Sequence, residues 1–230
     1  MNSLVKASLA EFLGTFALVF VGMAAVTVAP MQGIVVSAVA HGLIVAGLMF
    51  ALGAFSGGQF NPAVTLALTL GNKEKPVRAV MFIAVQFVGA FLAALVVLNM
   101  IPEQFQVVVE EGLNWNEGLA IGAMTTTGGM WWSATLEGIQ TFILVTVFFQ
   151  AVAYGRAGNL APLAIGLTLV ALIAAFGVYT GTSVNPARTL GPALAAGSMN
   201  HVLPYLVGIF GGGALAGVFN GYVLTPDKNI

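Results

Sequence analysis

The sequence contains the tripeptide Asn-Pro-Ala twice, and both copies indicate the start of a helix. Asparagine is a favoured N-cap residue, and a proline at the first helical position gives up an N–H that would have no partner there. Each helix start also presents unpaired N–H groups and the positive end of the helix dipole. Two such ends facing each other would repel cations and donate hydrogen bonds to a small polar molecule. The residues concerned are Asn61, Pro62, Ala63, Asn185, Pro186 and Ala187.

Two glutamates stand at equivalent points of the sequence. The pattern Glu-x-x-x-Thr-Phe-x-Leu-Val begins at Glu11 and again at Glu137. A carboxylate in such an apolar segment can belong to a proton relay. The duplication, without a second titratable side chain beside either copy, favours a structural role instead. We predict that both carboxylates accept hydrogen bonds behind the tripeptides, and a proton relay remains the alternative.

The composition excludes several classes of chemistry. The chain has 230 residues, no cysteine and two histidines, which excludes disulfides, thiolate chemistry and the common zinc motifs. It also lacks the Gly-x-Ser-x-Gly motif of serine hydrolases. A net charge of -1 without a basic cluster argues against nucleic acid, whose binding requires several neutralised phosphates. We therefore expect no catalytic residue, no metal, no cofactor and no nucleic-acid partner.

The elements that must carry these residues are membrane-spanning helices. Hydrophobic residues make up 59% of the chain and charged residues only 7%, too few to cover the surface of a soluble domain. The apolar residues fall in blocks long enough to cross a bilayer, which takes about 20 residues per helix. The predicted spans are 5–27, 33–54, 77–100, 132–154, 161–180 and 202–224.

Two shorter apolar segments, 61–70 and 185–196, begin at the tripeptides. At about 1.5 Å per residue, each crosses only about half of a hydrocarbon core that is about 30 Å thick. We interpret them as re-entrant half-helices. Because each half of the chain holds an odd number of full spans, the second half must be inverted relative to the first. Inverted repeats place their functional site near the bilayer midplane, where the half-helices are expected to meet.

The predicted fold is an all-α membrane protein with six transmembrane helices, two re-entrant half-helices and an inverted internal repeat. We expect a single channel domain over 1–230, with a first repeat at about 1–100, a connecting outer loop at about 101–131 and a second repeat at about 132–230. Basic residues gather on one face, which the positive-inside rule makes cytoplasmic, together with both termini. They are Lys6, Lys73, Lys75, Arg78, Arg156 and Lys228.

These motifs resemble those of the aquaporin and glycerol-facilitator family, the major intrinsic proteins. The resemblance rests on the paired tripeptides, on Ser-Gly-Gly-Gln-Phe at 56–60, on Ala-Glu-x-x-Gly-Thr-Phe at 10–16 and on Arg188 after the second tripeptide. It covers nearly the whole chain and implies a homotetramer with one pore per subunit. Gln86, followed by Val-Gly-Ala, matches a further family pattern, and we group it with the two glutamates as support for the half-helices.

The resemblance also implies a selectivity filter outside the midplane. Counting from the two tripeptides assigns it to four residues, His41, Ile173, Thr182 and Arg188. In this family the arginine donates hydrogen bonds to the permeating molecule and excludes cations. A guanidinium inside a membrane costs about 3 kcal/mol on insertion scales, which packing alone does not explain. The set is most similar to that of plant tonoplast aquaporins, although His41 could instead be a satisfied core residue.

The resemblance implies a passive channel for water, with ammonia, urea and hydrogen peroxide as further permeants and with protons and ions excluded. Thr189 and Ala193 stand where glycerol facilitators carry an aspartate and a basic residue, which favours water. A glycerol or small polyol facilitator remains the alternative. Two further classes stay open, an ion-coupled secondary transporter, which also uses inverted repeats, and a non-conducting structural membrane protein. The expected partners are water, small neutral solutes, the lipid bilayer and further copies of the chain.

Overall fold

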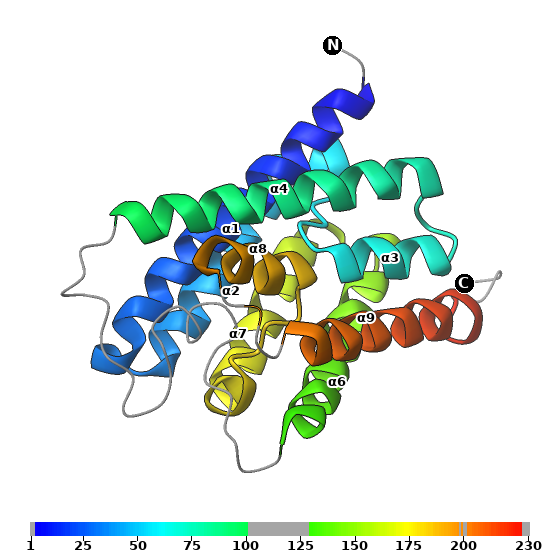
Figure 1. Ribbon diagram of the computed structural model, residues 1–230. Helices are drawn as coiled ribbons and strands as arrows, with labels where there is room; N and C mark the ends of the chain where they lie inside the picture. The colour runs from blue at the N-terminus through cyan, green and yellow to red at the C-terminus, as the bar shows by residue number, and fades with distance from the viewer. Residues whose placement is uncertain (1–2, 101–128, 198, 200–201, 227–230) are drawn as a thin grey trace.

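The computed structural model describes residues 3–100, 129–197, 199 and 202–226. Over these residues the chain forms helices and no strands (Figure 1). Six helices are long and apolar enough to cross a membrane, as the sequence predicts. The long helices are α1 (Ser3–Gln32), α2 (Ile34–Ser56), α4 (Pro76–Met100), α6 (Met130–Phe148), α7 (Ala161–Thr180) and α9 (Val202–Val218).

Two short helices occupy the positions predicted for the half-helices. They are α3 (Pro62–Leu70) and α8 (Pro186–Ala196). Short turns extend three of the long helices: the π-helical turns η2 (Phe149–Ala153) and η4 (Phe219–Val223) follow α6 and α9, and the 3-10 turn η3 (Gly158–Leu160) precedes α7. The all-α membrane fold predicted from the sequence is confirmed.

The boundaries differ slightly from the predicted ones. α6 begins at Met130, two residues before the predicted span at 132–154. Most of the predicted connecting loop at 101–131 lies outside the described residues, and so does Lys228.

The half-helices pack reciprocally between the two halves of the chain. α3, from the first half, packs on α9 from the second, whereas α8 packs on α4. The long helices pair alike in both halves, because α1 packs against α2 and α4 while α6 packs against α7 and α9. Figure 1 shows α3 and α8 between α4 and α9. This exchange brings the two Asn-Pro-Ala tripeptides together in the interior.

Glycines allow close contact between helix backbones. A Cβ atom at Gly217 of α9 would lie 2.5 Å from the backbone oxygen of Ala67 in α3. A Cβ atom at Gly89 of α4 would lie 2.6 Å from the backbone oxygen of Phe12 in α1. Helices in a membrane associate through such packing, since lipid offers little hydrophobic driving force between them.

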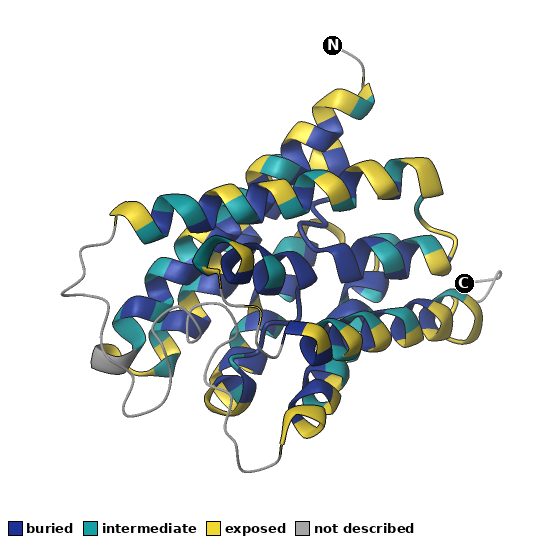
Figure 2. Cartoon of the chain, in the orientation of Figure 1, coloured by how far each residue is buried: buried dark blue, intermediate teal, exposed yellow. Residues whose placement is uncertain are grey.

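The outside of the bundle is apolar and its interior is partly polar. Large hydrophobic side chains point outward, among them Val77 (76% exposed) and Leu215 (68% exposed). The fully buried side chains include Glu11, Gln86 and Glu137. Figure 2 shows exposed positions on the outer faces of the long helices, whereas α3 and α8 are mostly buried. This distribution suits a protein whose surface meets lipid and whose interior lines a polar path.

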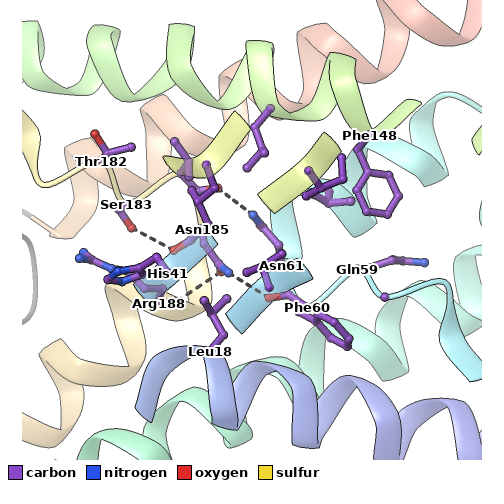
Figure 3. Close-up of a pocket in the computed structure, with 17 residues that line it drawn as sticks. Leu18, His41, Gln59, Phe60, Asn61, Phe148, Thr182, Ser183, Asn185 and Arg188 are labelled. Carbon is purple, nitrogen blue, oxygen red and sulfur yellow. Dashed lines mark hydrogen bonds between the residues drawn. The ribbon is translucent and has the colours of Figure 1, made fainter. Parts of the chain in front are cut away.

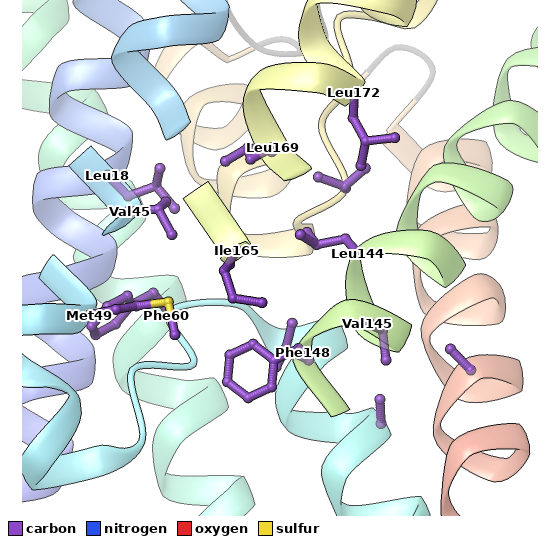
Figure 4. Packing of buried hydrophobic residues seen from close by; sticks show 14 of the residues in the cluster. Leu18, Val45, Met49, Phe60, Leu144, Val145, Phe148, Ile165, Leu169 and Leu172 are labelled. Atoms are coloured by element: carbon purple, nitrogen blue, oxygen red, sulfur yellow. The ribbon is translucent and has the colours of Figure 1, made fainter. Parts of the chain in front are cut away.

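A hydrophobic cluster forms one wall of this interior. It includes Met49 of α2, Phe60 of the loop before α3, Leu144 of α6, and Ile165 and Leu169 of α7 (Figure 4). The cluster joins elements of both repeats, so both halves of the chain are needed to enclose the interior.

Candidate functional site

Each Asn-Pro-Ala tripeptide starts a half-helix in the way its residue types predict. Asn61 precedes α3 in an extended conformation, and its Oδ1 accepts a hydrogen bond from the backbone N–H of Ala63 at 2.9 Å. Asn185 precedes α8 in a similar conformation, and its Oδ1 accepts from the N–H groups of Ala187 at 3.0 Å and Arg188 at 3.3 Å. In both helices a proline occupies the first turn, where its missing N–H is not needed.

The two helix starts are joined by crossed hydrogen bonds. Asn61 Nδ2 donates to the carbonyl oxygen of Val184 at 2.8 Å, and Asn185 Nδ2 donates to the carbonyl oxygen of Phe60 at 2.9 Å (Figure 3). Each acceptor is the residue immediately before the opposite asparagine. An amide NH2 carries two N–H groups, and each of these bonds uses one. One donor of each asparagine is therefore left for another partner.

The loop before each asparagine has the same unusual backbone. Phe60 has a φ of 48° and Val184 a φ of 45°, left-handed values that non-glycine residues rarely adopt and that are strained for a β-branched valine. Such conformations cost about 1–3 kcal/mol each and persist only where the surrounding contacts fix them. The carbonyl groups of these two residues are the acceptors in the crossed bonds, so the strain belongs to the joint between the half-helices.

Glu11 fixes the first loop from behind. Its carboxylate accepts from the backbone N–H of Gln59 at 2.9 Å and from that of Phe60 at 2.6 Å. Gln86 of α4 adds a third bond, because its Nε2 lies 2.7 Å from the same carboxylate and 3.1 Å from Thr65 Oγ1. The carboxylate thus links α1, α4 and the strained loop before α3.

Glu137 fixes the second loop in the same manner. Its carboxylate accepts from the backbone N–H groups of Ser183 at 2.9 Å and Val184 at 2.8 Å. Tyr205 occupies in α9 the place that the glutamine holds in α4, since a Val-Gly pair follows both residues at the same spacing. Its hydroxyl donates to the carbonyl oxygen of Thr180 at 2.7 Å, at the end of α7. The second repeat therefore uses a different side chain to support its loop.

A narrow cavity of about 40 Å³ runs past both asparagines. A water molecule needs on the order of 15 Å³, so the cavity has room for only a few. Figure 3 shows the two asparagines in the middle of this path. Its ends are marked on one side by His41, Thr182 and Arg188 and on the other by Gln59 and Phe148.

Three of the four residues predicted for the selectivity filter line this cavity. They are His41, Thr182 and Arg188. Ile173 is not among the lining residues, because it is buried in the hydrophobic cluster. From the same helix, Leu169 lines the cavity instead, one turn before Ile173.

The filter residues offer both a donor and an acceptor. Arg188 is 6% exposed, and its Nη1 has no hydrogen-bond partner within the described part of the chain. His41 Nδ1 lies 2.8 Å from the carbonyl oxygen of Ser37, so in the neutral ring Nδ1 donates and Nε2 is the acceptor. Figure 3 shows the two side chains next to each other. The arginine nitrogen is therefore a charged donor for a molecule inside the cavity.

Sequence analysis did not assign some of the lining residues. Leu18 and Leu144 occupy equivalent places in the repeated Glu-x-x-x-Thr-Phe-x-Leu-Val pattern, and both line the cavity. Seven residues separate each leucine from its glutamate, which places the two side chains on one helix face, so the repeat itself carried the signal. Gln59 and Phe148 also line the cavity, and no repeated motif marks them.

The described residues offer no metal site. They contain no group of three or more His, Cys, Asp or Glu side chains that could hold a metal ion. The buried carboxylates of Glu11 and Glu137 are instead engaged with backbone N–H groups. The cavity is thus built from hydrogen-bonding groups and apolar walls.

Comparison with known proteins agrees with this geometry. Residues 1–220 match the family model for the major intrinsic proteins. The chain is 34% identical over 247 residues to "Probable aquaporin TIP3-2" of Arabidopsis thaliana, which covers 98% of this chain and 86% of the relative. It is 35% identical over 232 residues to Aquaporin-5 of Homo sapiens, covering 97% and 82%. The X-ray structure of the aquaglyceroporin from Plasmodium falciparum has the same fold, with a TM-score of 0.75 at 22% identity over 97% of this chain and 98% of that one. The chain belongs to the major intrinsic protein family.

Proposed function

We propose that this chain is a passive channel that conducts water across a membrane and excludes protons and ions. The observation that carries the proposal is the pair of asparagines that cap opposed half-helices and donate to each other's loops inside a narrow cavity. The similarity to aquaporins over nearly the whole chain supports the same conclusion.

The asparagine pair orients water at the midplane. A water molecule there accepts hydrogen bonds from the remaining N–H groups of Asn61 and Asn185, so its own hydrogens point toward the two mouths. Because its oxygen is fully engaged, it cannot accept a proton from the next water, and the chain of hydrogen bonds that would carry protons is interrupted. The positive ends of the α3 and α8 dipoles repel cations at the same place.

Selectivity among solutes arises at the end of the cavity that His41, Thr182 and Arg188 form, with Ile173 packed behind. The unpaired Nη1 of Arg188 donates to the permeating molecule, and its fixed charge repels cations. This repulsion is stronger than in bulk water, because the apolar surroundings lower the effective dielectric constant.

A glycerol or small polyol facilitator is the second candidate, because the fold is shared with an aquaglyceroporin. The residues of α8 favour water. Thr189 and Ala193 are both fully buried there, at the positions where the resembling glycerol facilitators carry an aspartate and a basic residue. Ammonia, urea and hydrogen peroxide are further permeants in this proposal, since each is small, neutral and able to donate hydrogen bonds.

The protein is an integral multi-pass membrane protein, and we place both of its termini on the cytoplasmic side. Lys73 Nζ lies 4.4 Å from the centre of the Tyr154 ring, so the loop after α3 and the end of η2 share one face. Lys75, Arg78 and Arg156 belong to the same connections, and the positive-inside rule assigns such a face to the cytoplasm. A homotetramer, with one pore in each subunit, follows from the family resemblance.

A solute panel on purified protein in liposomes tests this proposal. Stopped-flow light scattering measures the swelling or shrinking rate under gradients of an impermeant osmolyte, glycerol or urea. We expect a fast, non-saturating water flux and a much slower glycerol flux. A glycerol flux that matches the water flux would favour the facilitator. Saturable uptake driven by an ion gradient would identify a secondary transporter, and permeability equal to that of bare lipid would identify a non-conducting protein.

A further inference from the structure

Gln59 lies at the end of the narrow cavity that is opposite to His41 and Arg188 (Figure 3). Gln59 and Phe148 also line a second, wider cavity of about 450 Å³. Charged side chains from the connection between α3 and α4 and from the start of α4 line this wider cavity as well, including Glu74 and Arg78. Gln59 therefore stands where the narrow path opens into a polar mouth.

The amide of Gln59 is held in one orientation by a chain of interactions. Its Nε2 donates to Glu74 Oε2 at 2.8 Å. The Glu74 side chain is only 6% exposed, and Arg78 Nη1 lies 3.6 Å from the same carboxylate oxygen. Arg78 is anchored in turn, because its Nη2 donates to the carbonyl oxygen of Ser56 at 2.9 Å. A carboxylate accepts only from the NH2 end of an amide, so the carbonyl end of Gln59 must point elsewhere.

That carbonyl oxygen, Gln59 Oε1, is buried and has no hydrogen-bond partner within the described residues. The whole residue is only 6% exposed. The loop itself does not need this oxygen, since the backbone N–H of Gln59 already donates to Glu11. Buried acceptors in folded proteins almost always have a partner, either protein or ordered water. A molecule that passes through the cavity can be that partner.

We propose that Gln59 determines the rate of water passage between the asparagine pair and the mouth, as an acceptor for each passing water, and that Glu74 is a positioning residue that holds its amide. This inference rests on the proposed water conduction. The polarity is the suitable one, because water oriented by the asparagines points its hydrogens toward this end and thus meets an acceptor. The neighbouring wall is apolar and offers no other hydrogen bond from its side chains; it includes Leu18, Val64, Leu144 and Phe148.

Substitutions of Gln59 test the acceptor directly. Gln59→Leu keeps a similar volume and removes the oxygen, and we expect the water permeability per channel to fall about fivefold, the rate equivalent of one net hydrogen bond. Gln59→His restores both functions, because an imidazole can donate one ring N–H to Glu74 and accept at the other nitrogen. We expect this variant to stay within about twofold of the wild type, a ratio well below the effect of one hydrogen bond.

Glu74→Ala tests the positioning role, with Lys75→Ala as a matched control on the exposed side of the same loop. We expect Glu74→Ala to lower the permeability in the wild-type background and to have no further effect in the Gln59→Leu background. Additive effects of the two substitutions would show that Glu74 acts independently of Gln59. The Lys75→Ala variant should conduct as the wild type does.

The outcomes separate this inference from the function on which it rests. Wild-type protein that conducts water, together with unchanged conduction in folded Gln59→Leu protein, overturns the role of Gln59 and leaves the channel function intact. A Gln59→His variant as impaired as Gln59→Leu overturns it too. If Gln59→Leu protein does not fold, as judged by gel filtration in detergent, unchanged conduction by Glu74→Ala decides against the proposal. Wild-type protein without water permeability above that of lipid overturns both.

Discussion

At the scale of single residues, each asparagine of the pair combines several tasks in one side chain. Its Oδ1 caps a half-helix, one N–H holds the opposite loop, and the second N–H is left for a permeating molecule. Aspartate can perform only the first of these tasks, because an ionised carboxylate accepts hydrogen bonds and donates none. A comparison of asparagine with aspartate therefore separates capping from donation.

Asn185→Asp is expected to admit cations. The aspartate still caps α8, so the half-helix remains, but it brings a negative charge to the midplane and loses the bond to the carbonyl of Phe60. A stabilisation of only about 1.4 kcal/mol for a cation at this point raises its equilibrium occupancy about tenfold. Cation flux into proteoliposomes, followed with an ion-sensitive dye, measures the change. The matched variant Asn61→Asp should behave alike, and intact cation exclusion in both would contradict the proposed barrier.

His41→Ala is expected to raise the ratio of glycerol to water permeability. The ring lines the cavity beside Arg188, and its removal widens the path for solutes larger than water. Ile173→Val is a useful comparison, because Ile173 does not line this cavity and its shortening should leave the ratio close to that of the wild type. Swelling rates in water and glycerol gradients give both ratios. Equal relative changes of the two rates in His41→Ala would show that the histidine does not set the width.

At the scale of the elements, the two strained loops are the parts that most need external support. Their left-handed residues, Phe60 and Val184, adopt a conformation that their side chains disfavour. Buried carboxylates from α1 and α6 compensate by accepting the backbone N–H groups of these residues. The repetition of this arrangement in both halves indicates that it fixes the joint between α3 and α8.

Glu137→Gln is expected to destabilise the protein. The glutamine oxygen can accept one of the two backbone N–H groups, but its own NH2 then faces the other, and an unsatisfied buried donor costs about 1–3 kcal/mol. Thermal unfolding in detergent should show a lower melting temperature, and water permeability should fall with it. Glu11→Gln should have the same effect in the first repeat. Undiminished stability combined with lost proton-dependent transport would instead support the proton relay.

The sequence predicts the elements well and the joint between them poorly, for physical reasons. Helix starts at Asn61 and Asn185 depend on capping and proline geometry, which are local, and the spans depend on length and hydropathy. The left-handed loop residues could not be predicted, because Glu11 enforces them from 48 residues away. Spacing located the turn of α7 near Ile173, but the rotation of that helix, which sends Leu169 to the cavity, is set by packing.

At the scale of the whole molecule, the two repeats exchange their half-helices. Each half-helix packs on the third long helix of the other repeat, so the asparagine pair is placed by contacts that neither half can make alone. Glycines mediate these contacts. A Cβ atom at Gly213 of α9 would lie 3.1 Å from the carbonyl oxygen of Ala63, within the first tripeptide itself.

Gly213→Val is expected to displace α3 and to reduce water permeability. Overpacking of this kind costs about 1–3 kcal/mol, and here the strain falls directly on the tripeptide. Gly211→Val in the same helix is the control, because a Cβ atom at Gly211 has no neighbour within 4 Å. Permeability and melting temperature are measured for both variants. Equal behaviour of the two would mean that close contact between α9 and α3 does not position the asparagines.

The most direct measurement of the central claim is water permeability and proton conductance on the same proteoliposomes. Purified wild-type protein is subjected first to an osmotic gradient and then to a pH gradient with an internal pH-sensitive dye. A path interrupted at Asn61 and Asn185 predicts water flux far above that of bare lipid and proton flux equal to it. Water flux at the lipid level, or proton flux that rises together with water flux, would contradict the account.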